Sequence, residues 1–96
     1  MEYKIKVSKL ATRNIDDAIG YYKKVSSSSA KNFKKRILEG YKFLKLNPFF
    51  VIKYNNVRAL PVKKFPYILF FDVDEDNKIV SILSVFCTHQ NPEKYP

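Results

Sequence analysis

The stretch YILFFDVD-EDNK-IVSILSVF, residues 67–86, decides the fold class of this chain. Its first eight residues, Tyr67 to Asp74, are almost continuously apolar, which is typical of a central strand covered on both faces. Glu75 to Lys78 predict a polar turn, and Ile79 to Phe86 predict a second apolar strand. Two such strands joined by a short polar turn predict an antiparallel hairpin within a sheet.

Two helical patterns precede this hairpin. Asn14, with Asp17 three residues later, is expected to cap the first helix in a weak variant of a capping box. The last residue of the serine run, Ser29, is expected to cap the second helix, which Asn47-Pro48 ends. Because few residues join them, the two helices should form an antiparallel hairpin. The second helix carries an apolar stripe at helical spacing: Ala30, Phe33, Ile37, Tyr41 and Leu44.

The segments that flank the helices predict further strands. Glu2 to Ser8 alternates strictly between polar and apolar residues, as a half-buried strand does. Phe49 to Tyr54 is expected to be a linker or short strand, followed by a turn at Asn55-Asn56. Val57 to Val62 is expected to be an irregular strand interrupted by Pro61. We therefore expect one α+β domain over residues 1–96, with a strand, a helical hairpin on one sheet face and an antiparallel sheet.

The net charge of +9 lies mostly in the first half of the chain. Residues 1–48 hold 12 Lys/Arg and 4 Asp/Glu, whereas residues 49–96 hold 6 and 5. A field of this kind attracts polyanions and acidic partners, and the alternative is a solvated helix face kept soluble by lysine. The N-terminus lacks the apolar region of a signal peptide, and no apolar run is long enough to span a membrane. These features predict a cytoplasmic protein with no membrane partner.

Several kinds of chemistry are not expected. The chain has one His and one Cys, too few for a structural zinc site, so no metal is expected. It has two glycines, both inside helical patterns, so no nucleotide cofactor is expected, and Gly40 is expected to allow close packing between the helices. Cys87 and His89 have the spacing of a nucleophilic pair. The favoured interpretation is a buried cysteine that ends a strand and a surface histidine that begins a polar tail.

The basic residues of the sheet half are candidates for function. Arg58, Lys63 and Lys64 have the chemistry to hold a phosphate backbone. Four further residues are candidates for stacking on bases or for proton transfer: Tyr54, Tyr67, His89 and Tyr95. The alternative for a tyrosine on a strand is a half-buried place in the core, which we favour for Tyr67.

The order of these features resembles the RelE/ParE superfamily of toxins from bacterial type II toxin–antitoxin modules, also called plasmid stabilisation proteins. The resemblance rests on four segments along nearly the whole chain. IDDAIGYY, residues 15–22, resembles the first helix of the family, and LKLNP, residues 44–48, resembles the segment that ends its second helix. VRALPVKKFPY, residues 57–67, and ILSVFCTHQNPEKY, residues 82–95, resemble its two sheet blocks.

The resemblance implies a strongly twisted antiparallel sheet, an antitoxin partner and one of two targets. RelE-like members cleave messenger RNA in the ribosomal A site, whereas ParE-like members inhibit DNA gyrase. In nuclease members, basic residues of the sheet and an arginine and a tyrosine or histidine near the C-terminus do the work. Metal-free cleavage by a 2′-hydroxyl needs such a base, acid and cations.

This chain departs from the nuclease pattern in its tail. Thr88 to Pro92 contains no arginine, and Cys87 replaces the family histidine, with His89 two residues later. The candidate catalytic residues are Arg58, Lys64, His89 and Tyr95, and the candidate target-binding residues are Arg58, Lys63, Lys64 and His89.

The arginine-poor tail favours a ParE-like inhibitor of DNA gyrase that a cognate antitoxin neutralises. The alternatives are a RelE-like ribosome-dependent endoribonuclease and a decayed member that still folds. The antitoxin is expected to cover an apolar strip of the sheet or helical hairpin, drawn by the basic first half. The sequence leaves the oligomeric state open.

Overall fold

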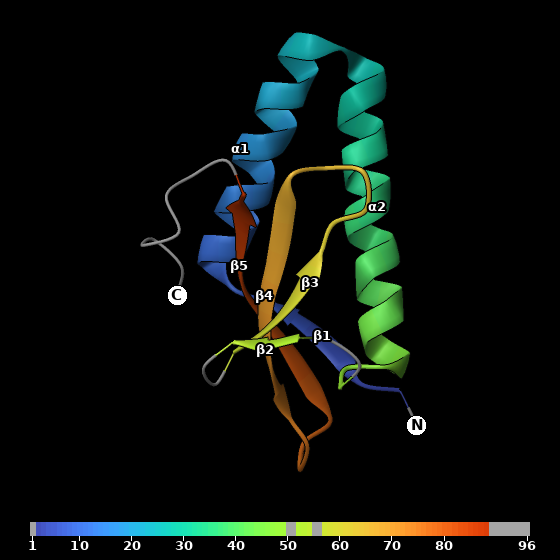
Figure 1. Cartoon of the computed structure of the whole chain (residues 1–96), viewed down its shortest axis with the longest axis vertical. Helices are drawn as coiled ribbons and strands as arrows, with labels where there is room; N and C mark the ends of the chain where they lie inside the picture. Colours follow the sequence, from blue (N-terminus) through green and yellow to red (C-terminus); the bar gives the residue numbers. More distant parts are fainter. Residues whose placement is uncertain (1, 50–51, 55–56, 89–96) are drawn as a thin grey trace.

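The computed structural model describes residues 2–49, 52–54 and 57–88, and its elements follow one another in the predicted order (Figure 1). Strand β1 is followed by two helices and then by four strands. The bounds are β1 Lys4–Val7, α1 Lys9–Val25, α2 Ser27–Leu46, β2 Ile52–Tyr54, β3 Val57–Pro61, β4 Tyr67–Asp74 and β5 Ile79–Cys87.

The two helices begin earlier than the sequence patterns predict. Ser8 caps α1, because its side chain accepts a hydrogen bond from the N–H of Ala11, so the prediction that Asn14 and Asp17 form a capping box is wrong. Ser26 caps α2 in the same way through the N–H of Ser29, so the prediction that Ser29 is the cap is also wrong. Both errors have one cause. Several serine and asparagine residues could cap each helix, and the spacing of the sequence does not show which of them has the extended backbone that a cap residue needs.

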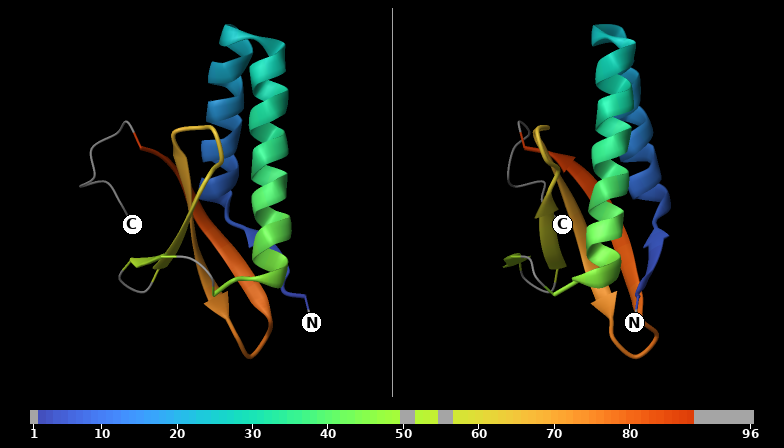
Figure 2. Two further views of the ribbon diagram at one scale, coloured as in Figure 1. Left: turned by 45° about the vertical axis from the view of Figure 1, so that its right-hand side comes forward. Right: turned by 90° about the vertical axis from the view of Figure 1, so that its right-hand side faces the viewer.

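The five strands form one twisted sheet in the order β1-β5-β4-β3-β2 (Figures 1 and 2). The predicted antiparallel hairpin is confirmed, with Tyr67 opposite Cys87 and Asp74 opposite Ile79. The strands β2 to β5 are antiparallel, as expected. β1 differs, because it pairs in parallel with β5 and makes the sheet mixed. The predicted turn at Asn55-Asn56 lies outside the described residues.

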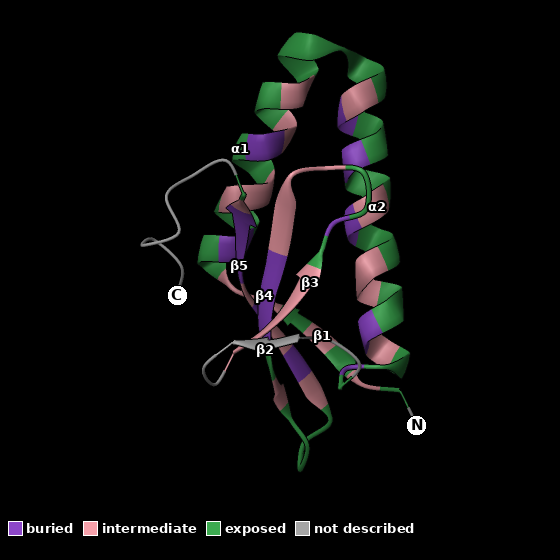
Figure 3. Cartoon of the chain, in the orientation of Figure 1, coloured by how far each residue is buried: buried purple, intermediate pink, exposed green. Residues whose placement is uncertain are grey.

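Both helices pack on one face of the sheet, as predicted (Figure 2). Ile5 and Val7 of β1 pack against the core with the buried side chains of the two helices. The predicted stripe of α2 is confirmed, since Tyr41 packs against the core and the other four residues are buried (Figure 3). In the described part of the chain, neither helix is apolar enough over a sufficient length to cross a bilayer.

Gly40 faces the sheet and not the other helix. A Cβ atom at this position would lie 3.2 Å from Cδ1 of Leu69 and 3.6 Å from Cδ2 of Leu60. The prediction that Gly40 allows the two helices to approach each other is therefore wrong. The missing side chain allows α2 to lie close to β3 and β4 instead.

Candidate functional site

Arg58 lies in β3, and its guanidinium contacts Phe49, which follows α2. Its carbon Cζ lies 5.0 Å from the centroid of the Phe49 ring, and Nη1 donates a long hydrogen bond of 3.5 Å to the Phe49 carbonyl. The Phe49 ring in turn makes an edge contact with the Tyr3 ring, with 6.0 Å between the ring centroids. On the Tyr3 ring, Lys78 Nζ lies 5.2 Å from the centroid. Arg58 thus joins a row in which two aromatic rings lie between two cations, and this row ties β3 to the corner after α2.

Lys63 and Lys64 lie at the other end of β3, in the loop that leads to β4. Both are exposed, and Lys64 has a φ of 68°, a left-handed conformation that costs a residue with a side chain about 1–2 kcal/mol. The three residue steps of β3 from Arg58 to Pro61 already span about 10 Å. The structure therefore separates Arg58 from the two lysines with which the sequence grouped it.

The polar tail begins beside the loop of residues 62–66, which we call the lysine loop because it carries Lys63 and Lys64. The backbone N–H of Thr88 donates to the Pro66 carbonyl at 2.7 Å, and its hydroxyl donates to the same oxygen at 3.1 Å. Cys87 ends β5, as the favoured interpretation predicted, but it is half-buried and not buried. His89 and Tyr95, the other two candidate residues, lie outside the described residues.

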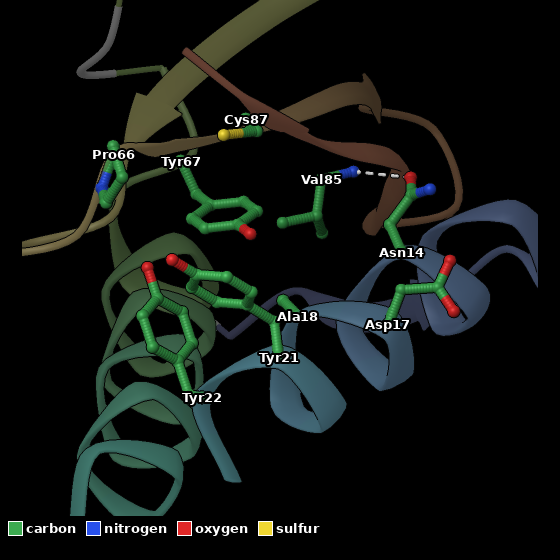
Figure 4. A pocket seen from close by; sticks show the side chains of 9 residues that line it. All are labelled: Asn14, Asp17, Ala18, Tyr21, Tyr22, Pro66, Tyr67, Val85 and Cys87. Atoms are coloured by element: carbon green, nitrogen blue, oxygen red, sulfur yellow. Dashed lines mark hydrogen bonds between the residues drawn. The ribbon is translucent and has the colours of Figure 1, made fainter. Parts of the chain in front are cut away.

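A pocket of about 500 Å³ opens between α1 and the ends of β4 and β5 (Figure 4). Three tyrosine rings and the Asp17 carboxylate give the pocket its chemical character. Figure 4 shows the hydroxyls of Tyr21 and Tyr22 close together, with the Tyr67 ring across from them. The pocket is lined by Asn14, Asp17, Ala18, Tyr21, Tyr22, Pro66, Tyr67, Val85 and Cys87.

Tyr67 is a hydrogen-bond donor and not a base at neutral pH. Burial, together with the neighbouring Cys87 thiol, raises the pKa of Tyr67 from 10.0 to about 12. Burial also raises the pKa of Tyr22. Tyr67 contacts Phe33 at 5.1 Å between ring centroids, and Tyr22 contacts Phe65 at the same distance. The favoured interpretation of Tyr67 as a half-buried core residue therefore agrees with its surroundings.

A second groove, of about 760 Å³, runs between β1 and the C-terminal half of α2. Its lining combines the apolar side chains of Ile5, Val7 and Leu38 with charged ones, mostly lysines. The sequence patterns did not single out this groove, because its residues come from two segments more than thirty positions apart. It is lined by Glu2, Tyr3, Lys4, Ile5, Val7, Leu38, Tyr41, Lys42 and Lys45.

β1 is an edge strand, and its outer edge borders this groove. The N–H groups of Lys4 and Ser8 donate to the carbonyls of Lys78 and Ile82, so these residues direct their backbone groups toward β5. Backbone direction alternates along a strand, so Ile5 and Val7 direct theirs outward. Among the described residues no strand pairs with this edge.

A sequence model described as "ParE toxin of type II toxin-antitoxin system, parDE" matches residues 5–92. The chain belongs to the ParE toxin family. This ParE-family protein is accordingly a toxin of a type II toxin–antitoxin system, within the wider RelE/ParE superfamily. No curated protein sequence gives a significant match.

Solved structures share the fold of this ParE-family toxin at low sequence identity. A chain of the chromosomal ParDE system from P. aeruginosa superposes with a TM-score of 0.72 at 21% identity, covering 88% of this chain and 94% of that one. A chain of the archaeal RelE–RelB complex from Pyrococcus horikoshii OT3 gives 0.63 at 16% identity, with 95% and 100% covered. The isolated E. coli RelE toxin gives 0.55 at 14% identity, with 95% and 89% covered. The predicted fold is confirmed.

The described residues contain no group of three His, Cys, Asp or Glu side chains close enough to hold a metal ion. The candidate functional features are therefore the lysine loop, the tyrosine pocket and the groove beside β1.

Proposed function

We propose that this ParE-family toxin inhibits DNA gyrase and does not cleave RNA. The observation that carries the proposal is the position of Arg58. Its guanidinium lies over the Phe49 ring and makes a long contact of 3.5 Å with the Phe49 carbonyl, so part of its binding capacity is used within the chain. RNA cleavage by a 2′-hydroxyl passes through a negatively charged phosphorane, and its stabilisation requires cations that converge on one point. Arg58 lies near the start of β3 and Lys64 lies beyond its end, so their backbone positions are far apart along the strand, which favours a role other than catalysis for the pair.

The chemistry of Tyr67 supports the same proposal. General-base catalysis near pH 7 requires a group whose pKa lies near that pH. With a pKa of about 12, Tyr67 keeps its proton and cannot accept another from a 2′-hydroxyl. Among the described residues, Tyr67 therefore does not supply the base that ribonuclease chemistry needs.

One contact favours the RelE-like alternative: Thr88, at the start of the tail, binds Pro66 in the lysine loop. The two hydrogen bonds from Thr88 to Pro66 put the start of the tail next to the loop of Lys63 and Lys64. His89 is the next residue in the sequence. In this alternative, Lys63, Lys64 and His89 act together without Arg58.

Two assays on the same protein separate these functions. In the first, purified toxin is added to gyrase and relaxed plasmid, and the proposal predicts that supercoiling stops. In the second, messenger RNA ends are mapped after induction in cells, and the proposal predicts an unchanged pattern. Codon-phased ends that disappear in His89→Ala or Lys64→Ala would refute the gyrase proposal. Harmless expression with neither effect would support the decayed member.

We further infer that a cognate antitoxin binds the groove beside β1. The similar solved structures include a ParDE system and a RelE–RelB complex, which makes an antitoxin partner the natural expectation. The groove combines apolar lining residues, the outer edge of β1 and the three lysines Lys4, Lys42 and Lys45. An extended segment with alternating apolar and acidic residues fits all three features, because it can add a strand to β1 and pair its carboxylates with the lysines.

A further inference from the structure

The end of the helical hairpin carries five lysines that we call the cationic tip. Figures 1 and 2 show this end extending beyond the loop between β3 and β4, away from the sheet. Residues 18–38 contain no Asp or Glu. Exposed residues predominate at this end (Figure 3). The cationic tip consists of Lys23, Lys24, Lys31, Lys34 and Lys35, all exposed.

The helices hold the backbone of the cationic tip in fixed positions. A single residue, Ser26, joins them: its N–H donates to the Tyr22 carbonyl at 2.8 Å, and its side chain accepts from the N–H of Ser29 at 3.0 Å. Behind this joint, Ala30 and Phe33 are buried. The five lysines are therefore presented together on one rigid projection and not on a loose tail.

The charges of the cationic tip are not compensated within the described part of the chain. None of the five lysines forms an ion pair there, and the ion pair that does occur, Arg36 with Glu39, leaves them out. Lys31 and Lys35 are four residues apart on α2, a spacing at which like charges destabilise a helix. The first turn of α2 has no acidic residue that would offset its positive dipole. On α2 this arrangement disfavours the helix, and an external polyanion would offset the effect. Lys23 and Lys24 differ, because they lie in the last turn of α1, where the helix dipole favours positive charge.

We propose that the cationic tip binds the phosphate backbone of duplex DNA. The biological setting rests on the proposed function, because gyrase holds duplex DNA and a toxin that also contacts that DNA stays near its target. Duplex DNA carries one negative charge per about 1.7 Å of helix axis, so several lysines on one projection can each neutralise a phosphate. Lysine ammonium groups bind phosphate as point charges, so the binding is independent of base sequence.

The composition of the cationic tip favours a duplex over a single strand. Proteins that bind single strands combine basic residues with several aromatic rings on which bases stack. Near the tip, Tyr21 is the exposed aromatic side chain, and its ring makes an edge contact with Tyr22 at 5.1 Å. The tip thus offers charge with little stacking surface.

The test is fluorescence anisotropy of a short labelled duplex titrated with the purified toxin, in the absence of gyrase. Salt is varied between about 50 and 200 mM, and the slope of log K against log salt is about −0.9 for each phosphate neutralised. We expect a slope of about −3 or steeper for the wild-type chain. Replacing all five lysines of the cationic tip by Gln should make the slope shallower by about 2 or more and weaken binding at low salt at least about tenfold.

A matched variant controls for total charge. It replaces five exposed cations elsewhere with Gln, so both variants lose five charges. We expect its slope to change by less than about 1. Both variants should melt within about 4 °C of the wild-type chain, because the replaced side chains are exposed and relief of the repulsion between Lys31 and Lys35 is worth about 0.2–0.5 kcal/mol. The replaced cations are Lys4, Lys6, Lys9, Arg13 and Lys42.

Three outcomes would overturn the proposal. Equal losses in the two variants would mean that net charge, and not the cationic tip, drives binding. Tighter binding to the single strand of the same sequence would assign the tip to single-stranded nucleic acid. Preferential binding to polyglutamate over the duplex would assign it to an acidic protein. Supercoiling inhibition is measured separately, so a failure of the gyrase proposal is distinguishable from a failure of DNA binding.

Discussion

The side-chain oxygen of Asn14 accepts a hydrogen bond of 3.0 Å from the backbone N–H of Val85, 71 residues later in the chain. The bond ties α1 to β5 next to an irregularity in the sheet, where Phe70 pairs with Ser84 but Phe71 pairs with Ile82. Leu83 is the extra residue, and its carbonyl accepts a hydrogen bond of 2.9 Å from the Ser8 hydroxyl. Two polar side chains from the start of α1 therefore bind backbone groups at the bulge of β5.

This relationship predicts that Asn14→Ala lowers the free energy of unfolding by about 1–3 kcal/mol, because it leaves the partly buried Val85 N–H without its acceptor. The control is Asn32→Ala, which removes an exposed asparagine from α2 and should change stability by less than about 0.5 kcal/mol. Urea denaturation of the two variants checks the difference. Equal stability would mean that water replaces Asn14 without cost.

The case of Asn14 also indicates how far sequence patterns go in this protein. The central strands and the buried stripe of α2 were predictable, because burial on both faces leaves a continuous apolar run in a strand and burial on one face imposes a helical period. The role of Asn14 was not, since a hydrogen bond to a bulge 71 residues away leaves no local pattern, and the residue was predicted to be a cap. The parallel pairing of β1 with β5 was likewise missed, because alternation defines the buried face of a strand but not the direction of its neighbour.

The candidate site shows the same limit. Lysines and Arg58 were recognisable as anion-binding residue types, but their grouping depends on the course of β3. The groove beside β1 was missed because neither of its two segments is distinctive alone. The sequence therefore predicts well which chemical groups are available, and it predicts poorly which of them lie close together in the fold.

The two glycines of the helices provide a matched pair of substitutions. Gly20→Ala should stabilise the protein by about 0.5–1 kcal/mol, because Ala favours the helix and nothing lies within 4 Å of the new Cβ. Gly40→Ala should gain less, since its Cβ would lie 3.2 Å from Cδ1 of the buried Leu69. Gly40→Leu should destabilise by about 1–3 kcal/mol through overpacking. Thermal melts of the three variants test this order, and an equal gain for both alanines would contradict the close approach of α2 to β4.

The left-handed backbone at Lys64 predicts a stabilising substitution in a candidate functional loop. Lys64→Gly should raise the free energy of unfolding by up to about 1 kcal/mol, because glycine adopts a φ of 68° without a steric penalty. Lys63→Gly should not stabilise, since this residue does not have a positive φ. Chemical denaturation measures both changes. Under the proposed function, Lys64→Gly leaves messenger RNA intact as the wild-type toxin does, whereas loss of an observed cleavage in this more stable variant would support the RelE-like alternative.

The raised pKa of Tyr67 predicts how stability changes in alkali. The folded chain keeps the Tyr67 proton up to a pKa of about 12, whereas the unfolded chain releases it near 10.0. The unfolded state therefore binds fewer protons in this window, and the contribution of Tyr67 to stability is complete below pH 10 and falls as the pH rises toward 12. Tyr67→Phe should flatten this part of the curve while changing little at pH 7. Urea midpoints measured from pH 8 to pH 11 provide the test, and parallel curves for the two proteins would show that Tyr67 does not titrate in this way.

Charge reversal at two places separates antitoxin binding from DNA binding. Lys42→Glu with Lys45→Glu introduces like charge into the groove where we place the acidic antitoxin segment, and we expect binding to weaken at least about tenfold. Lys31→Glu with Lys35→Glu changes the net charge equally at the cationic tip and should leave antitoxin affinity within about threefold. The probe is the cognate antitoxin, which we expect the gene next to that of the toxin to encode as a small protein with an acidic tail. Calorimetry gives both affinities. The same two variants should rank in the opposite order for duplex DNA. If both proteins lost antitoxin affinity equally, long-range attraction by the basic half of the chain would explain the binding, and the groove beside β1 would lose its assignment.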